Sequence, residues 1–85
     1  MEAERETGLE DLRRIVLVRE KDAAEAFEKV KEIIVLIERE PSEAKRWELL
    51  GRLRIAESML LSAVGKLLSS YRAYTAALEK KAGVR

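Results

Sequence analysis

Apolar residues recur at alternating steps of three and four along most of this chain, a spacing typical of amphipathic helices that pack together. The stretch from Ser42 to Lys81 contains no proline and keeps this spacing throughout. It predicts one long helix over residues 42–82, capped by Ser42 and ended by Gly83, with residues 84–85 as a tail. The a and d heptad positions, which we call the seam, hold Leu49, Leu53, Ala56, Leu60, Ala63, Leu67, Ser70, Tyr74 and Ala77.

The N-terminal half carries a second seam of the same kind. Thr7 and Glu10 have the spacing of a capping box, which places a helix start directly after Thr7. We therefore expect a helix over residues 8–39, preceded by a frayed segment over residues 1–6. Its a and d positions are Leu9, Leu12, Val16, Ala23, Ala26, Val30, Ile33 and Ile37.

Two features of this half argue against a simple helix. The β-branched runs at residues 15–18 and 33–37 favour strands by propensity, although charged helix formers flank both. Arg19 falls on a seam position, and Asp22 with Glu25 has the spacing of another capping box. We predict a continuous helix because no glycine, proline or asparagine marks a turn here. A break near residue 21, giving three helices, is the alternative.

Pro41 is the only proline, and it separates the two helical patterns by a short connection. A connection this short forces the helices to run antiparallel, with Ala26 facing Ala56. Charge supports the same orientation. Residues 1–12 carry five acids and one base, a net of −4, whereas residues 66–85 carry five bases and one acid, a net of +4. An antiparallel hairpin brings these opposite charges together.

The second predicted helix is apolar on a further side, so it needs cover on two sides. Small residues recur there at every seventh position from Ala44, and two of them are glycines that each cost roughly 1 kcal/mol relative to alanine inside a helix. Tolerated surface glycine is one explanation. We favour close approach of another helix, from a second copy of the chain or from another protein. The predicted interface is Trp47, Gly51, Ser58, Leu61, Gly65 and Leu68.

Composition points to association as well. A chain of 85 residues forms at most one domain and buries only roughly 60% of its unfolded surface, so its own core is marginal. Neither cysteine nor histidine is present, which removes disulfides and the usual zinc and haem ligands as means of stabilisation. Asparagine and glutamine are missing too, while 39% of the residues are charged. That composition is typical of thermophile proteins and is shared by idealised designs.

Catalytic chemistry has little support in this sequence. Without histidine or cysteine, Ser-His-Asp and Cys-His arrangements are excluded, and the isolated glycines form no phosphate loop. Ser62 and Lys66 lie one helical turn apart, a spacing common in any helix. Arg19, opposite Ala63 in the antiparallel register, is the one candidate for a buried anion contact; its alternative role is to carry its guanidinium to water or to a glutamate such as Glu57. We expect no catalytic residue, cofactor or metal site.

A nucleic-acid contact is the main alternative to a purely structural role. The candidate residues for an anion or nucleic-acid contact are Lys45, Arg46, Arg52 and Arg54. A net charge of +1 gives no global attraction, but patches repeated along a polymer would add their contacts. The longest uncharged run, residues 58–65, is far shorter than the ~20 residues that span a bilayer, and the acidic N-terminus is unlike a signal peptide. We therefore expect a soluble, cytoplasmic protein without membrane contact.

Together these patterns predict an all-α antiparallel two-helix hairpin that associates as a four-helix bundle. The expected role is non-enzymatic: a homo-oligomer, most simply a dimer, that serves as a structural or protein–protein interaction module. A nucleic-acid-associated, coat-forming or filament-forming subunit is the alternative. A small helical enzyme that binds an anionic substrate through arginines is more remote.

Overall fold

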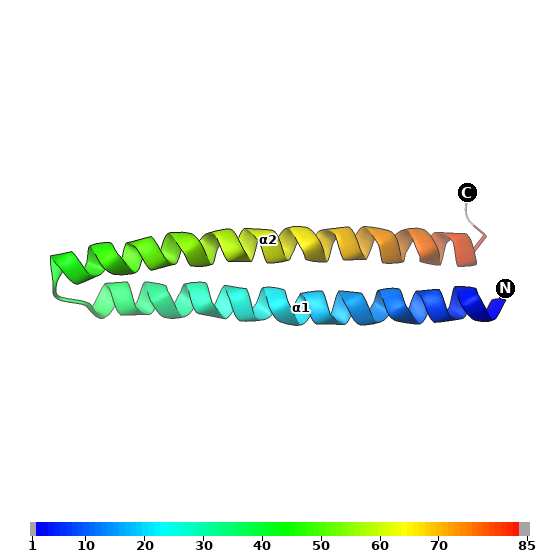
Figure 1. Cartoon of the computed structure of the whole chain (residues 1–85), viewed down its shortest axis with the longest axis horizontal. Helices are drawn as coiled ribbons and strands as arrows, with labels where there is room; N and C mark the ends of the chain where they lie inside the picture. The colour runs from blue at the N-terminus through cyan, green and yellow to red at the C-terminus, as the bar shows by residue number, and fades with distance from the viewer. Residues whose placement is uncertain (1, 84–85) are drawn as a thin grey trace.

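The computed structural model describes the backbone of residues 2–83 and the side chains of residues 8–83. The described chain forms two helices, α1 (Glu2–Arg39) and α2 (Glu43–Lys81), which lie side by side and run in opposite directions (Figure 1). The predicted all-α hairpin is therefore confirmed. Both β-branched runs are helical, and α1 continues through residues 19–22, so the three-helix alternative does not occur.

The start of α1 differs from the prediction. The helix begins at Glu2, so Thr7 is not its N-cap and the backbone of residues 2–6 is helical rather than frayed; Met1 lies outside the described residues. Residues 2–6 are Glu, Ala, Glu, Arg and Glu, all good helix formers, and acids in a first turn interact favourably with the helix dipole. The capping-box spacing at Thr7 therefore does not set the start of α1, because no residue in positions 2–6 disfavours a helix.

The connection over residues 40–42 is held by local hydrogen bonds. Ser42 caps α2 as expected, since its Oγ accepts a hydrogen bond from the Lys45 N–H at 3.4 Å. The Ser42 N–H donates to Glu40 Oε1 at 3.1 Å. Arg46 closes the turn, because its guanidinium donates to the carbonyl oxygens of Glu40 at 3.0 Å and Pro41 at 3.4 Å. These bonds satisfy polar groups that helix ends leave without partners.

The C-terminal end of α2 is also as predicted. The Ala82 N–H donates to the Leu78 carbonyl at 2.9 Å, and the Gly83 N–H donates to the Lys80 carbonyl at 3.1 Å. Gly83 has a φ of 79°, a left-handed conformation that glycine adopts without the steric cost of a Cβ atom. The predicted tail, residues 84–85, lies outside the described residues.

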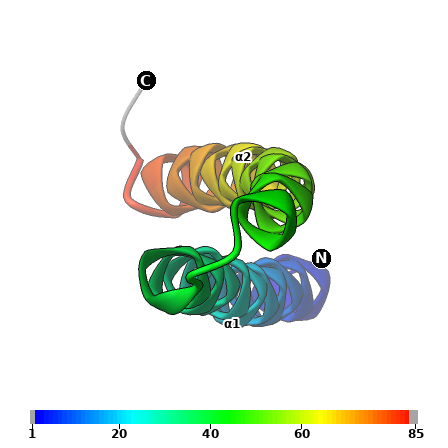
Figure 2. The same cartoon turned by 90° about the vertical axis from the view of Figure 1, so that its left-hand side faces the viewer.

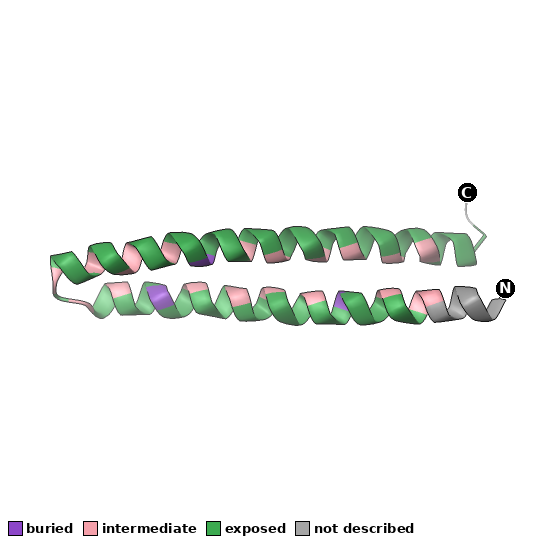
Figure 3. Ribbon diagram, in the orientation of Figure 1, coloured by how far each residue is buried: buried purple, intermediate pink, exposed green. Residues whose placement is uncertain are grey.

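The contact between α1 and α2 follows the predicted seam. Side chains at its a and d positions are buried or half-buried, whereas the outward surfaces are mostly exposed (Figure 3). Val16, Ile33 and Ala56 are the most enclosed, each 6% exposed. Arg19 shares the seam and is half-buried. Alternating steps of three and four thus keep one stripe of each helix against the other along the hairpin.

The hairpin is long and thin. It measures 62 × 20 × 14 Å and has a radius of gyration of 18.9 Å, whereas a compact chain of this length has about 12 Å. The view along its length shows the two helices stacked at a slight inclination (Figure 2). Its accessible surface is 7045 Å², about 1,900 Å² more than the roughly 5,100 Å² typical of a monomeric protein of this mass. Two helices alone therefore leave much apolar surface in water.

Candidate interaction surfaces

The seam divides the outside of the hairpin into two sides. Reversing one helix relative to the other places the e positions of both along one side of the seam and the g positions along the other. The Tyr71 hydroxyl, at an e position of α2, donates a hydrogen bond to the carboxylate of Glu20, at an e position of α1. Ile15 and Lys66, both at g positions, line a groove on the opposite side. We call these two surfaces the e side and the g side.

The e side is largely apolar. From Arg13 onward, six of its ten e positions are apolar: Phe27, Ile34, Leu50, Val64, Tyr71 and Leu78. The neighbouring b positions of α2 extend this surface with Trp47, Leu61 and Leu68, which are 66%, 75% and 47% exposed. We call these six e-position and three b-position side chains together the apolar face. Along α2 the apolar face runs from Trp47 to Leu78, about 46 Å at the helical rise of 1.5 Å per residue.

A row of small residues borders the apolar face on α2: Ala44, Gly51, Ser58 and Gly65, all exposed. A Cβ atom added at Gly51 or Gly65 would meet nothing within 4 Å. Contacts inside the hairpin therefore do not require glycine at either position. The interface predicted from the sequence lies on the b and f rows of α2 as one exposed strip, and the structure joins this strip to the e rows of both helices.

Phe27 is the aromatic contribution of α1 to the apolar face. The Lys31 ammonium nitrogen lies 4.9 Å from the centroid of the Phe27 ring, within the range of a cation–π contact. Lys31 Nζ is also 2.8 Å from Glu28 Oε1. The charged groups of this cluster can remain in water at the rim of an interface while the ring packs against a partner.

The g side has different chemistry, since six of its ten g positions from Ile15 onward are charged. Arg19 is distant in sequence from Ser62 and Lys66, yet all three meet in an open groove between the helices. The groove is lined by Leu12, Ile15, Arg19, Ser62, Gly65, Lys66, Ser69, Ser70 and Ala73. Ser70 already uses its hydroxyl, which donates to the Lys66 carbonyl at 2.9 Å.

Arg19 does not pair with Glu57. The ion pairs among residues 8–83 are Arg14 with Asp11 at 3.8 Å and the Lys31–Glu28 pair, both within α1. Glu57 occupies an e position, on the other side of the seam from the groove that Arg19 lines. Among residues 8–83 Arg19 therefore has no ion pair with Glu57, whereas access of its guanidinium to water through the groove is consistent with the structure.

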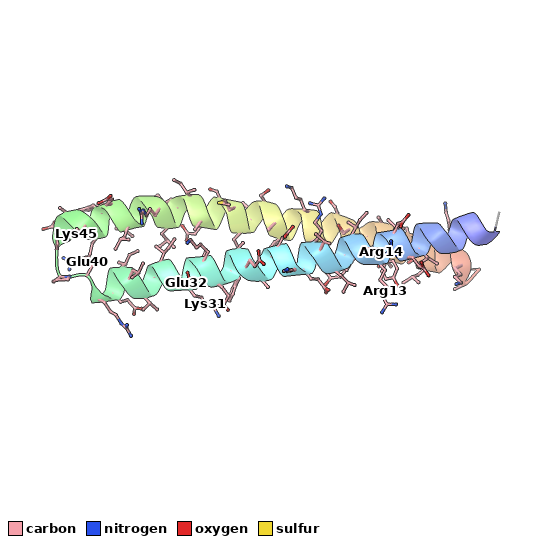
Figure 4. The ribbon with its side chains drawn as sticks, turned by 60° about the horizontal axis from the view of Figure 1, so that its bottom comes forward. Arg13, Arg14, Lys31, Glu32, Glu40 and Lys45 are labelled. Carbon is pink, nitrogen blue, oxygen red and sulfur yellow. The ribbon has the colours of Figure 1, made fainter. Side chains whose placement is uncertain are left out.

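The fold divides the basic stretch that was predicted as an anion contact. Arg46 bonds to the connection, Lys45 and Arg52 occupy g positions, and Arg54 lies at a b position beside the apolar face. Figure 4 places Lys45 at the connection, beside Glu40. Lys45 and Arg52 therefore share the g side near the connection, whereas Arg46 is bonded to the connection and Arg54 lies on another row of α2.

The link between Glu20 and Tyr71 alters one titration. The hydrogen bond to the Glu20 carboxylate raises the pKa of Tyr71 above its ordinary value of 10.0, with smaller contributions from partial desolvation and from the carboxylate charge. Ionisation of the phenol would remove the donated proton and place two negative charges together.

Reasoning from the sequence missed the union of the two e rows. Phe27 and Ile34 lie beside one seam, and Leu50 and Val64 lie beside the other, and the pattern of either helix alone gives them no common role. Their shared surface follows only when the heptad letters are combined with the antiparallel orientation. Heptad letters read together with the antiparallel orientation are therefore the sequence signal that reveals this shared surface.

Comparison of the chain with protein-family models, curated proteins and solved structures finds no match. Within residues 2–83, neither helix contains a stretch long and apolar enough to cross a bilayer. In the same part of the chain, no three His, Cys, Asp or Glu side chains are grouped so that they could hold a metal ion.

Proposed function

We propose that this chain is a non-enzymatic, homo-oligomeric helical-bundle protein that acts as a structural or protein–protein interaction module. In its simplest form, two hairpins pack their apolar faces together and form a four-helix bundle. The observation that supports this proposal is the apolar face itself. It combines side chains from both helices, continues for most of the length of α2, and is exposed in the single chain except at the half-buried Leu50.

The exposed area agrees with the needs of such a dimer. Obligate homodimers bury 2,000–5,000 Å² in total, or roughly 1,000–2,500 Å² on each partner. The surplus of about 1,900 Å² that the hairpin exposes relative to a compact monomer falls in that range. If the apolar faces pair, each chain can bury enough area to reach the accessible surface that is usual for a protein of its mass.

The shape of the apolar face also suits a helical partner. Helices inside a bundle use a, d and one flanking position, and the e rows supply that flank in both α1 and α2. Glycine and alanine beside the face allow another helix backbone to approach closely, which gives Gly51 a role that the single chain lacks. Trp47 is the largest exposed side chain of the face, and tryptophan is enriched among residues that dominate binding energy.

The experiment that tests this function is absolute mass in solution, measured by light scattering behind a sizing column over a wide concentration range. We expect a discrete dimer, or a small multiple of it, with the same mass in the presence of duplex DNA. A stable monomer at all concentrations would refute the proposal. Open-ended growth, or a mass shift on adding DNA that weakens steeply with salt, would instead favour the coat-forming or filament-forming alternative.

A further inference from the structure

The groove on the g side lies across the seam from the e rows that the proposed dimer pairs, and Gly65 is its only lining residue that also belongs to the predicted interface. Arg19 is its most unusual component, because an arginine occupies a seam position that is otherwise held by apolar and small residues. Charged groups at such positions cost stability unless they are paired or solvated. Among residues 8–83, no acceptor forms an ion pair or hydrogen bond with the Arg19 guanidinium.

The antiparallel register divides the groove into two chemically distinct ends. Arg19 lies level with Ser62 and Lys66, which gives this end two cations and a hydroxyl. Leu12 lies level with Ala73 at the other end, with Ile15 between them and the cations. None of the described side chains that line the groove is a carboxylate. The groove therefore runs from a cationic end to an end that is apolar on α1, at Leu12 and Ile15, and that Ala73 shares with Ser69 and Ser70 on α2.

We propose that this groove binds a free medium-chain carboxylate, with its head at Arg19 and Lys66 and its tail along Leu12 and Ile15. A guanidinium offers paired donors that match the two oxygens of a carboxylate, and the Ser62 hydroxyl can donate to the same head group. The groove's apolar residues would cover part of the aliphatic tail and remove it from water. From residue 12 to residue 19, α1 rises about 10 Å, which suits a chain of about eight carbons.

The amphiphilic lining is what selects this ligand class over a simple anion. Inorganic phosphate or acetate would use the cationic end and leave Leu12 and Ile15 in water. An uncharged alcohol of the same length would use the apolar end and leave Arg19 without a partner. Only a ligand that has both parts satisfies both ends of the groove.

The direct test is titration of the full chain with octanoate, below its micelle concentration, by calorimetry and by the methyl NMR signals of Leu12 and Ile15. We expect saturable binding with shifts confined to the groove, and binding roughly tenfold or more weaker for octan-1-ol and for acetate. Equal binding of octanoate and octan-1-ol, or no saturable binding of octanoate, would overturn the proposal.

Matched variants locate the head group. Arg19→Met keeps a long unbranched stem in the seam while removing the guanidinium, and we expect it to weaken octanoate binding roughly tenfold. Arg14→Met, on the exposed outer surface of α1, should leave the affinity unchanged and is the control. Unchanged affinity in Arg19→Met, with helical content preserved, would refute the site. Octanoate that binds only after a dimer is dissociated would show that a carboxylate of a second copy occupies the groove, and would also overturn the proposal.

Discussion

The Tyr71 hydroxyl donates a hydrogen bond to the Glu20 carboxylate, although the two residues are separated by 51 positions in the sequence. Both occupy e positions, so this single contact shows that the e rows of α1 and α2 share one side of the hairpin. The apolar residues of those rows consequently form one surface. The g rows, with Arg19 and Lys66, form the surface on the other side of the seam.

The Glu20–Tyr71 link predicts a loss of stability at alkaline pH. Because the pKa of Tyr71 is raised in the folded chain, its stabilising contribution is complete below pH 10.0 and is lost as the pH rises through the higher folded value. The difference in unfolding free energy between the native chain and Tyr71→Phe should therefore be constant near neutral pH and shrink above pH 10.0. Urea unfolding at a series of pH values measures it.

A second variant isolates the cause of this pH dependence. In Glu20→Gln the acceptor loses its charge, so the pKa of Tyr71 should fall toward its ordinary value in an ultraviolet titration of tyrosine. A Tyr71 titration that is identical in the native chain and in Glu20→Gln would contradict the Glu20 carboxylate as the cause of the raised pKa.

The apolar face predicts that two equivalent surface substitutions have different effects. Leu61 is 75% exposed on the apolar face, and Ile55 is 64% exposed toward the g side. Leu61→Lys places a charge in the proposed interface and should weaken association at least roughly tenfold, the effect of losing about 1.4 kcal/mol or more of binding energy. Ile55→Lys should leave it nearly unchanged. Sedimentation equilibrium gives the dissociation constant of the oligomer for each variant. Equal values for the two variants would argue against the apolar face as the interface.

The open space around Gly51 predicts opposite effects on folding and on association. Gly51→Ala should stabilise the helix by up to about 1 kcal/mol, since the added Cβ meets nothing within 4 Å apart from its chain neighbours and the adjacent backbone of its own helix. Gly51→Leu should lower the oligomeric mass while each hairpin stays helical, because the larger side chain keeps the partner helix away. Circular dichroism and light scattering separate the two effects. An unchanged mass in Gly51→Leu would exclude close approach at this position.

The seam predicts a steep penalty for added volume at Ala56. This side chain is only 6% exposed between the helices, so Ala56→Leu should destabilise the fold by about 1–3 kcal/mol through overpacking. Ala76 lies in the same helix but is exposed, and Ala76→Leu should change stability by less than about 0.5 kcal/mol. Thermal or urea unfolding of the two variants provides the comparison, and similar losses in both would show that the seam is not tightly packed.

The two sequence signals for helix starts predict different mutational costs. Ser42→Ala removes the side-chain oxygen that caps α2 and should cost about 1 kcal/mol. Thr7 lies within the backbone span of α1, so Thr7→Ala should be neutral or slightly stabilising through its higher helix propensity. Urea unfolding of both variants tests the difference. A larger loss for Thr7→Ala than for Ser42→Ala would place the start of α1 back at Thr7.

The sequence by itself determined the helices, their seams and their orientation. Leu9 to Ile37 and Leu49 to Ala77 repeat at heptad spacing, and this period specifies both a helix and the stripe that it buries. Pro41 then leaves too short a connection for anything except an antiparallel hairpin. These features are local in the chain, which is why they can be read from it directly.

The tertiary structure decided which residues far apart in sequence share a surface. Heptad letters describe each helix alone, so the union of Phe27 with Val64 on one side, and of Arg19 with Lys66 on the other, depends on how the two helices face each other. The start of α1 at Glu2 was decided in a different way. There a weak local cap competed with good helix formers, and the balance of small energies was not visible in the spacing of Thr7 and Glu10 alone.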